Sequence, residues 1–272
     1  MNPAKRVVES FDGIPIRYDV HGTGSPALVF VHGALCRRSQ WDAQMSHFAS
    51  NHTVVAIDLA GHGESGTGRR SWTMGAFGED VVAVIRELDV DHVMIIGHSM
   101  GGFAMLEAAT FEPDRVAGLV GVDTFRGIEA EPDPNRAKAI LDPLRSDFAQ
   151  AVAQGVKARF LPDSDSALVK RVTDDVMAMD PNAGVGEYEE LLQYGSRLRQ
   201  VLRELKPPVA VIASDWRPFD VAEADRYGVD VHFVSGTGHW PMMEKPTEFN
   251  VLLEGCVARM SGIVANLQNR EA

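Results

Sequence analysis

Short, continuous apolar runs alternate with amphipathic segments along most of this chain. Runs of this kind are typical of strands that are buried on both faces of a parallel sheet. Segment 77–88 shows the other pattern, because its apolar residues recur at helical spacing and share one face. Strands that alternate with helices indicate an α/β domain with right-handed crossovers. The apolar runs predict strands at 7–10, 14–20, 27–31, 54–57, 93–97, 116–122, 209–213 and 231–234.

The alternation stops between Asp123 and Pro207. Apolar residues recur there every four positions, over 140–156 and 168–176, and no strand pattern is present. We therefore expect a helical cap (lid) at 126–206, inserted into a core domain made of 1–125 and 207–272. The alternative is a mostly helical linker that packs elsewhere.

A serine stands where one apolar run meets one helical segment. The run 93–97 ends in glycine, Ser99 follows, and the helix formers of 103–109 come shortly after it. Gly97 and Gly101 lie two residues before and two after the serine, where a tight strand-to-helix turn has no room for side chains. Such a turn forces the serine into a positive φ and exposes its hydroxyl above the sheet. The pattern Gly-His-Ser-Met-Gly thus predicts a nucleophile elbow.

A serine hydroxyl is a weak nucleophile until a base accepts its proton. His239 is the expected base, because it follows the last strand in a glycine-rich loop, at the edge of the sheet where α/β sites lie. An oxyanion hole needs two backbone N–H donors. Met100, directly after the serine, is expected to provide one, and Ala34 the other. His98 is expected to pack beside the strand.

The chain resembles the α/β-hydrolase superfamily over nearly its whole length. The resemblance rests on His32-Gly33, the loop 58–65, the elbow 97–102 and the loop 236–239, in that order. It implies an α/β-hydrolase fold, with a mostly parallel eight-stranded sheet flanked by helices and a helical cap inserted after strand six. These motifs are specific for the fold but weak for the substrate, because this fold hosts many chemistries.

The acid of the implied Ser-His-Asp triad has two main candidates. Most members of the superfamily carry it after strand seven, where this chain has Arg217 at the usually acidic position and Asp215 nearby. Some members, including certain haloalkane dehalogenases, carry it at the end of strand six, and Asp123 fits that placement. We expect Asp123 to be the acid and keep Asp215 as the alternative. Asp220 is better explained as a helix cap.

These residues predict a cofactor-free serine hydrolase that cleaves a carboxylic ester or lactone through an acyl-enzyme. The enzyme alternatives are a C–C bond hydrolase, a perhydrolase or haloperoxidase, and a lyase. A non-catalytic protein that only binds a small ligand is a further alternative. Trp240, next to the expected base, should contact the substrate, and Phe160 and Met177 of the cap are further candidates for the pocket wall.

Composition narrows the list of partners to a small-molecule substrate. The chain has 272 residues, of which 45% are hydrophobic and 24% charged, as in an ordinary globular protein. A net charge of −12 argues against nucleic acid or an anionic membrane as a partner. No metal-ligand spacing and no dinucleotide fingerprint is present, so no metal or cofactor is expected. The oligomeric state stays open, with a homodimer as one possibility.

The two cysteines, Cys36 and Cys256, are too few for a disulfide framework and fit a reducing compartment. The first residues lead into no apolar signal-peptide region, and no apolar run reaches the length of a membrane span. The expected location is therefore the cytoplasm.

Overall fold

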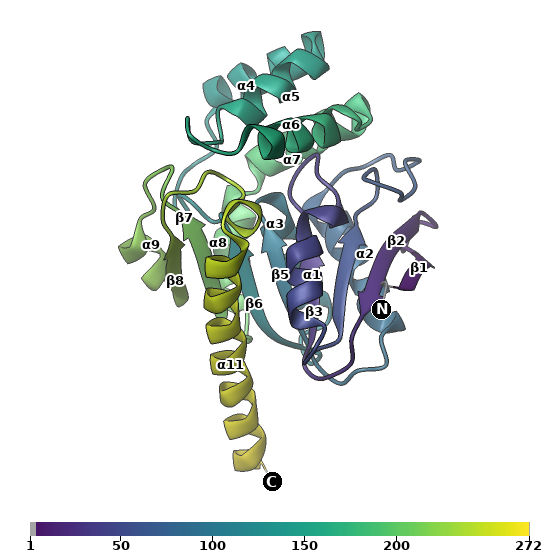
Figure 1. The fold of residues 1–272 in the computed structure, drawn as a ribbon, viewed down its shortest axis with the longest axis vertical. Helices are drawn as coiled ribbons and strands as arrows, with labels where there is room; N and C mark the ends of the chain where they lie inside the picture. The colour runs from purple at the N-terminus through teal and green to yellow at the C-terminus, as the bar shows by residue number, and fades with distance from the viewer. Residues whose placement is uncertain (1–3, 272) are drawn as a thin grey trace.

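The computed structural model describes residues 4–271, and an eight-stranded sheet runs through its centre (Figure 1). The strand order is β1-β2-β4-β3-β5-β6-β7-β8. β1 pairs antiparallel with β2, and β2 with β4, whereas the remaining pairs are parallel. The expected mostly parallel, eight-stranded sheet is confirmed. The strands are β1 (Ala4–Glu9), β2 (Pro15–His21), β3 (Ala27–Val31), β4 (Val54–Asp58), β5 (Val93–His98), β6 (Val116–Val122), β7 (Val209–Ser214) and β8 (Val229–Val234).

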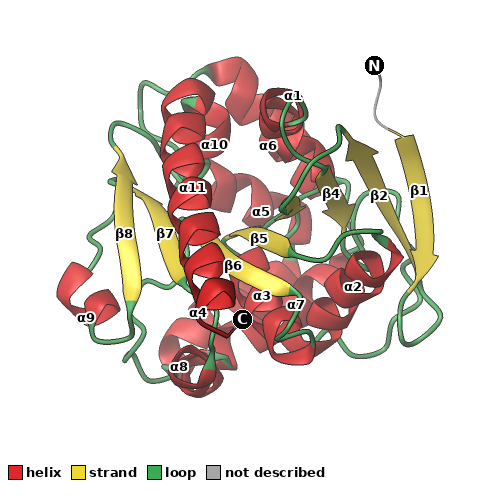
Figure 2. Cartoon of the chain, turned by 90° about the horizontal axis from the view of Figure 1, so that it is seen from below, coloured by secondary structure: helices red, strands yellow, loops and turns green. Residues whose placement is uncertain are grey.

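Helices cover both faces of this sheet, and Figure 2 shows β1 and β8 at its opposite edges. Apolar residues fill a core cluster on each face; Phe77 and Met105 belong to one cluster, Trp41 and Phe249 to the other. The layer behind the sheet in Figure 1 contains α2 (Met74–Glu87), α3 (Met100–Phe111) and α8 (Gly195–Glu204). The layer in front contains α1 (Asp42–Phe48), after the short helix η1 (Arg38–Trp41), and α11 (Pro246–Glu271), after the short α10 (Pro241–Glu244). The short helix α9 (Val221–Asp225) lies beside β8.

Between β6 and β7 the chain forms four helices that stand above the sheet, before α8 returns to pack beside α3 (Figure 1). They are α4 (Pro134–Ser146), α5 (Phe148–Lys157), α6 (Ser166–Met177) and α7 (Pro181–Gln193), and we call them the cap helices. An aspartate precedes each one, and its carboxylate accepts a backbone N–H of the first turn; these caps are Asp133, Asp147, Asp165 and Asp180. The regular apolar spacing over 140–156 therefore belongs to two helices, because Asp147 starts a new one.

The turn from β5 into α3 leaves no space for two side chains. Ser99 lies at its apex with φ 51° and ψ −116°, the strained conformation that the elbow motif predicts. A Cβ on Gly97 would lie 2.3 Å from the carbonyl oxygen of Gly101, and a Cβ on Gly101 would lie 2.4 Å from that of His32. Both obstacles are backbone atoms, so relief would require the strand or helix to shift.

Gly101→Ala should therefore destabilise the protein, by about 3 kcal/mol, because the added methyl group overpacks the strand–helix contact. Gly255→Ala is the matched control: Gly255 lies in α11 with no atom within 4 Å of an added Cβ. Alanine there should stabilise the helix by about 0.5–1 kcal/mol. Urea unfolding of both variants is the measurement. Equal stability of Gly101→Ala and the parent protein would contradict this account of the turn.

Candidate active site

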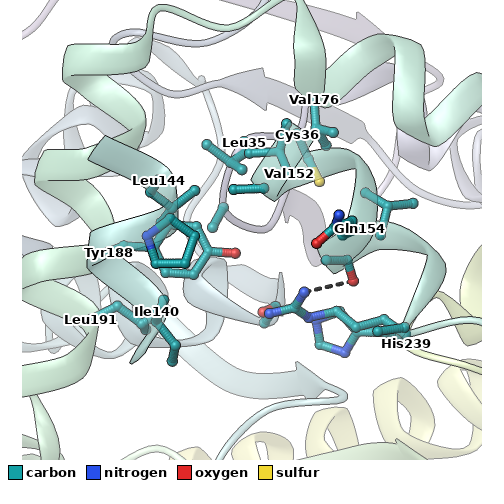
Figure 3. Close-up of a pocket in the computed structure, with 18 of the residues that line it drawn as sticks. Leu35, Cys36, Ile140, Leu144, Val152, Gln154, Val176, Tyr188, Leu191 and His239 are labelled. Carbon is teal, nitrogen blue, oxygen red and sulfur yellow. Dashed lines mark hydrogen bonds between the residues drawn. The ribbon is translucent and has the colours of Figure 1, made fainter. Parts of the chain in front are cut away.

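Ser99 lines a cavity of about 370 Å³ that lies between the sheet edge and the cap helices. The parallel strands end at this edge, which is where sites form in α/β proteins. The cavity's far wall is apolar, with Leu35 from the β3 loop and Leu144, Val152 and Val176 from cap helices (Figure 3). His239 also lines the cavity, so the structure brings the serine and the histidine to one surface.

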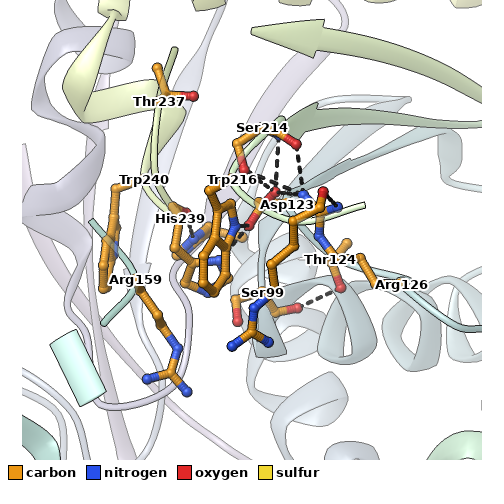
Figure 4. A network of polar contacts seen from close by, with 12 residues as sticks. Ser99, Asp123, Thr124, Arg126, Arg159, Ser214, Trp216, Thr237, His239 and Trp240 are labelled. Carbon is orange, nitrogen blue, oxygen red and sulfur yellow. Dashed lines mark hydrogen bonds and ion pairs between the residues drawn. The ribbon is translucent and has the colours of Figure 1, made fainter. Parts of the chain in front are cut away.

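Asp123 holds the other side of the His239 ring. Nδ1 of His239 donates to Oδ2 of Asp123 at 2.5 Å (Figure 4). This hydrogen bond places the proton on Nδ1 and leaves Nε2 of neutral His239 as the acceptor. Asp123 follows β6 with φ 45°, a left-handed conformation that an aspartate tolerates better than most residues.

The carboxylate of Asp123 is buried and accepts four further hydrogen bonds. Oδ1 accepts from the Ser214 backbone N–H at 3.0 Å, the Ser214 hydroxyl at 2.6 Å and Nη2 of Arg126 at 2.5 Å. Oδ2 also accepts from Nε1 of Trp216 at 2.9 Å. Burial alone would raise the pKa of Asp123, but the His239 contact, the Arg126 charge and the Ser214 hydroxyl outweigh it and hold that pKa well below its usual range. Asp123 is therefore ionised at neutral pH.

Two backbone hydrogen bonds fix the position of His239. Its N–H donates to the carbonyl of Arg159 at 2.8 Å, and its own carbonyl accepts from Nε2 of His98 at 2.7 Å. Burial, with the nearby His239 ring, lowers the pKa of His98 to about 3, so His98 is a neutral donor at physiological pH. From the sequence we expected His98 only to pack beside the strand, so its hydrogen bond to the His239 carbonyl was not predicted. The sequence contains no signal for it, since 141 positions separate the two histidines.

Asp215 and Asp220 each accept a backbone N–H rather than contacting the His239 ring. The carboxylate of Asp215 accepts the backbone N–H of Gly236, at 2.9 Å to Oδ1, and so holds the loop after β8. Asp220 caps α9 through the N–H of Glu223, as expected. The guanidinium of Arg217 lies over the Trp216 ring, 4.1 Å from its centroid, rather than pairing with Asp215.

One expected oxyanion donor begins the helix after Ser99, and the other lies in the loop after β3. Met100 is the first residue of α3, where a backbone N–H has no partner within the helix. Ala34 lines the same cavity as Ser99. The next residue, Leu35, has φ 62° and donates its N–H to Oε1 of Glu187 at 2.8 Å. Glu187 on cap helix α7 thus helps to hold the Ala34 loop.

Glu187 is also paired with a buried histidine. Its Oε2 lies 2.9 Å from Nε2 of His62, and both side chains are fully buried. Nδ1 of His62 donates to the carbonyl of Ala60, so both ring nitrogens face an oxygen. Burial by itself would lower the pKa of His62, but the Glu187 carboxylate and the Ala60 carbonyl raise it.

The three expected pocket residues lie in different places. Trp240 lines the cavity beside His239. Phe160 stacks on the Trp240 ring, with centroids 4.7 Å apart, and supports Trp240 from outside the cavity. Met177 is 45% exposed and lies away from the cavity, so its expected place in the pocket wall is wrong. The reason is helical geometry: Val176 takes the buried position on α6, and the next residue is turned outward.

Comparison with known proteins agrees with this fold. The model of the Alpha/beta hydrolase family matches residues 28–251. The chain is 26% identical over 257 residues to 3-oxoadipate enol-lactonase 2 of Acinetobacter baylyi, covering 91% of this chain and 95% of the lactonase. It is 27% identical over 263 residues to the dihydrolipoyllysine-residue acetyltransferase component of the acetoin cleaving system of Cupriavidus necator. That match covers 89% of this chain but only 66% of the relative. A solved thermophilic esterase from Thermogutta terrifontis aligns with a TM-score of 0.81 at 20% identity, covering 96% and 99% of the two chains.

The family match spans most of the chain, and this chain therefore belongs to the alpha/beta hydrolase family. Its relatives and structural neighbours include esterases, a lactonase and a bromoperoxidase. Within residues 4–271, no helix is long and apolar enough to cross a membrane. In the same part of the chain, no group of three or more His, Cys, Asp or Glu side chains is placed to hold a metal ion.

Proposed function

We propose that this protein is a cofactor-free serine hydrolase that cleaves a carboxylic ester or a lactone. One observation carries the proposal: Asp123 fixes the His239 ring so that Nε2 is free, and His239 and Ser99 line one cavity. The match to an enol-lactonase over most of both chains supports the lactone among the possible substrates.

In the first step, Oγ of Ser99 attacks the carbonyl carbon of the substrate while its proton moves to Nε2 of His239. The carbonyl oxygen becomes an oxyanion, which accepts hydrogen bonds from the backbone N–H groups of Ala34 and Met100. Asp123 stabilises the imidazolium that forms and stays ionised itself.

Collapse of the tetrahedral intermediate breaks the bond to the alcohol oxygen, which leaves with the proton from His239. A water molecule then gives its proton to Nε2 of His239, and its oxygen attacks the acyl carbon. The acid leaves and the proton returns to Oγ of Ser99. Among the described residues, Ser99 makes no hydrogen bond to His239; such catalytic contacts are often long until substrate binds.

Ser99→Ala should lower kcat on p-nitrophenyl esters by about 10⁶-fold, because no other group can form the acyl-enzyme. Labelling by a fluorophosphonate should disappear with it, while circular dichroism should stay unchanged, since only one hydroxyl is removed. A folded variant that keeps more than a few per cent of kcat would rule out Ser99 as the nucleophile.

Asp123→Asn should lower kcat by about 10⁴-fold, because an amide can hold His239 in the wrong tautomer. Asp215→Asn is the matched control, since that carboxylate contacts the loop after β8 and not the ring. Side-by-side kcat values, with folding checked by circular dichroism, are the measurement. A dead, folded Asp215→Asn enzyme beside a normal Asp123→Asn enzyme would move the acid to Asp215.

In the pH profile of kcat/KM, the fall on the acid side (the acid limb) should have its midpoint below pH 6.5. Burial lowers the pKa of His239; the Asp123 contact opposes this, and the charges of Arg159 and Arg126 add to the lowering. Catalysis needs the neutral ring, so a lowered pKa keeps the enzyme active to a lower pH, and kcat/KM falls as pH drops through that pKa. Arg159→Gln should move the limb upward. An acid limb above 6.5 in the parent enzyme would contradict the assignment.

A further inference from the structure

A second cavity meets the first one at the proposed catalytic residues. It encloses about 260 Å³ and shares Ser99, His239 and Arg159 with the apolar cavity. Ile140 of α4 and Tyr188 and Leu191 of α7 line both cavities, but only the first reaches α5 and α6, and only the second reaches the loops after β6 and β7. A substrate bound at Ser99 therefore has a separate surface for the groups on each side of its ester bond.

The second cavity is lined by four arginines: Arg126, Arg136, Arg159 and Arg217. Arg126 is paired with Asp123. Within the described residues, the guanidinium groups of Arg136, Arg159 and Arg217 make no ion pair with a carboxylate. The guanidinium of Arg159 donates to the carbonyl of Gly155, and Arg159 lines both cavities together with Ser99 (Figure 4).

The acidic residues of this cavity have partners already. Asp123 accepts five hydrogen bonds, as described above. Glu131 pairs with Arg199, at 2.9 Å, and Asp133 caps helix α4. Within the described residues, none of the three lining carboxylates forms an ion pair with Arg136, Arg159 or Arg217, although the whole chain carries a charge of −12.

The arginines also act on one another. Partial burial lowers the pKa of Arg217, and the charges of Arg159, Arg136 and Arg126 lower it further. Like charges that repel in the free protein gain free energy when an anion binds between them.

We propose that the substrate is an ester or lactone that carries a carboxylate, and that this group binds in the arginine-lined cavity while the apolar part of the substrate fills the other one. This inference rests on the proposed hydrolase function. Guanidinium groups bind carboxylates through paired N–H donors. A carboxylate fits better than a phosphate, because a phosphate carries a charge of about −1.5 to −2 at pH 7 and costs more to bury beside Phe103 and Leu198.

The test compares substrates that differ only in charge. One pair is p-nitrophenyl hydrogen glutarate and its methyl ester, with the carboxylate on the acyl side. The other pair is 3-butanoyloxybenzoate and its methyl ester, with the carboxylate on the alcohol side. We expect kcat/KM for the charged member of at least one pair to exceed that of its methyl ester by about tenfold or more. The preference should weaken as salt rises, because Arg136 and Arg217 are exposed.

Variants then assign the preference to the cavity. Arg136→Gln and Arg217→Gln together should remove most of the preference, because kcat/KM should fall much further on the charged ester than on its methyl ester. Lysine at both positions should keep part of it. Arg145→Gln is the matched control, because Arg145 pairs with Glu189 on the surface and lines neither cavity. Equal rates on both members of both pairs, or a preference that survives the double glutamine variant, would overturn the proposal.

Two further comparisons make the outcome specific. Stronger preference for the matched phosphonate, p-nitrophenyl 4-phosphonobutyrate, would overturn the choice of a carboxylate. Ser99→Ala distinguishes a failure of the substrate inference from a failure of the proposed hydrolase function. If it abolishes turnover of the neutral methyl esters while the charged substrates show no advantage, the hydrolase assignment stands and the inference about the substrate fails. Turnover that survives Ser99→Ala would remove the hydrolase assignment itself.

Discussion

The close approach of α3 to the end of β5 is the constraint on which the rest of the site depends. Backbone carbonyls occupy the space that side chains of residues 97 and 101 would need, so the backbones of the strand and the helix are in direct contact. This contact holds Ser99 with φ 51° and places it at the edge where the parallel strands end. Because β6 and β8 end at the same edge, Asp123 and the loop of His239 reach the serine without long connections.

The surroundings of Asp123 show how a buried charge can be kept ionised. A carboxylate without partners would be protonated in such a place, because burial disfavours the charged form. Five donors and the Arg126 charge reverse that tendency, and the same contacts fix the direction in which the carboxylate faces His239. His98 and Arg159 hold the backbone on either side of the ring. The geometry of the proposed base is therefore set by groups from β5 and β7 and from the loops after α5 and β6, and single-site changes at these groups should alter the position of His239.

Much of the fold could be predicted from the chain, because its signals are local. Apolar runs identified the strands, and Gly97 and Gly101 identified the elbow, since a side chain at either position would clash with a backbone carbonyl. The break at Asp147 was missed, because the apolar spacing of a helix continues across it while the capping aspartate starts a new helix. Met177 was misplaced although the apolar spacing over 168–176 marks the buried face of α6, because residue 177 follows that face by one position and is turned outward.

The sequence by itself determined the class of fold, the serine at its elbow and the histidine loop, because each follows from spacing and residue type within a few positions of the chain. Only the tertiary structure decided which aspartate contacts His239, because Asp123 and Asp215 both end strands at one edge and differ only in what the folded chain brings to them. It alone also brought Arg136, Arg159 and Arg217, which come from three separate segments, around one cavity. Such contacts join residues far apart in the chain, and their free energy depends on burial and distance, which no local pattern encodes.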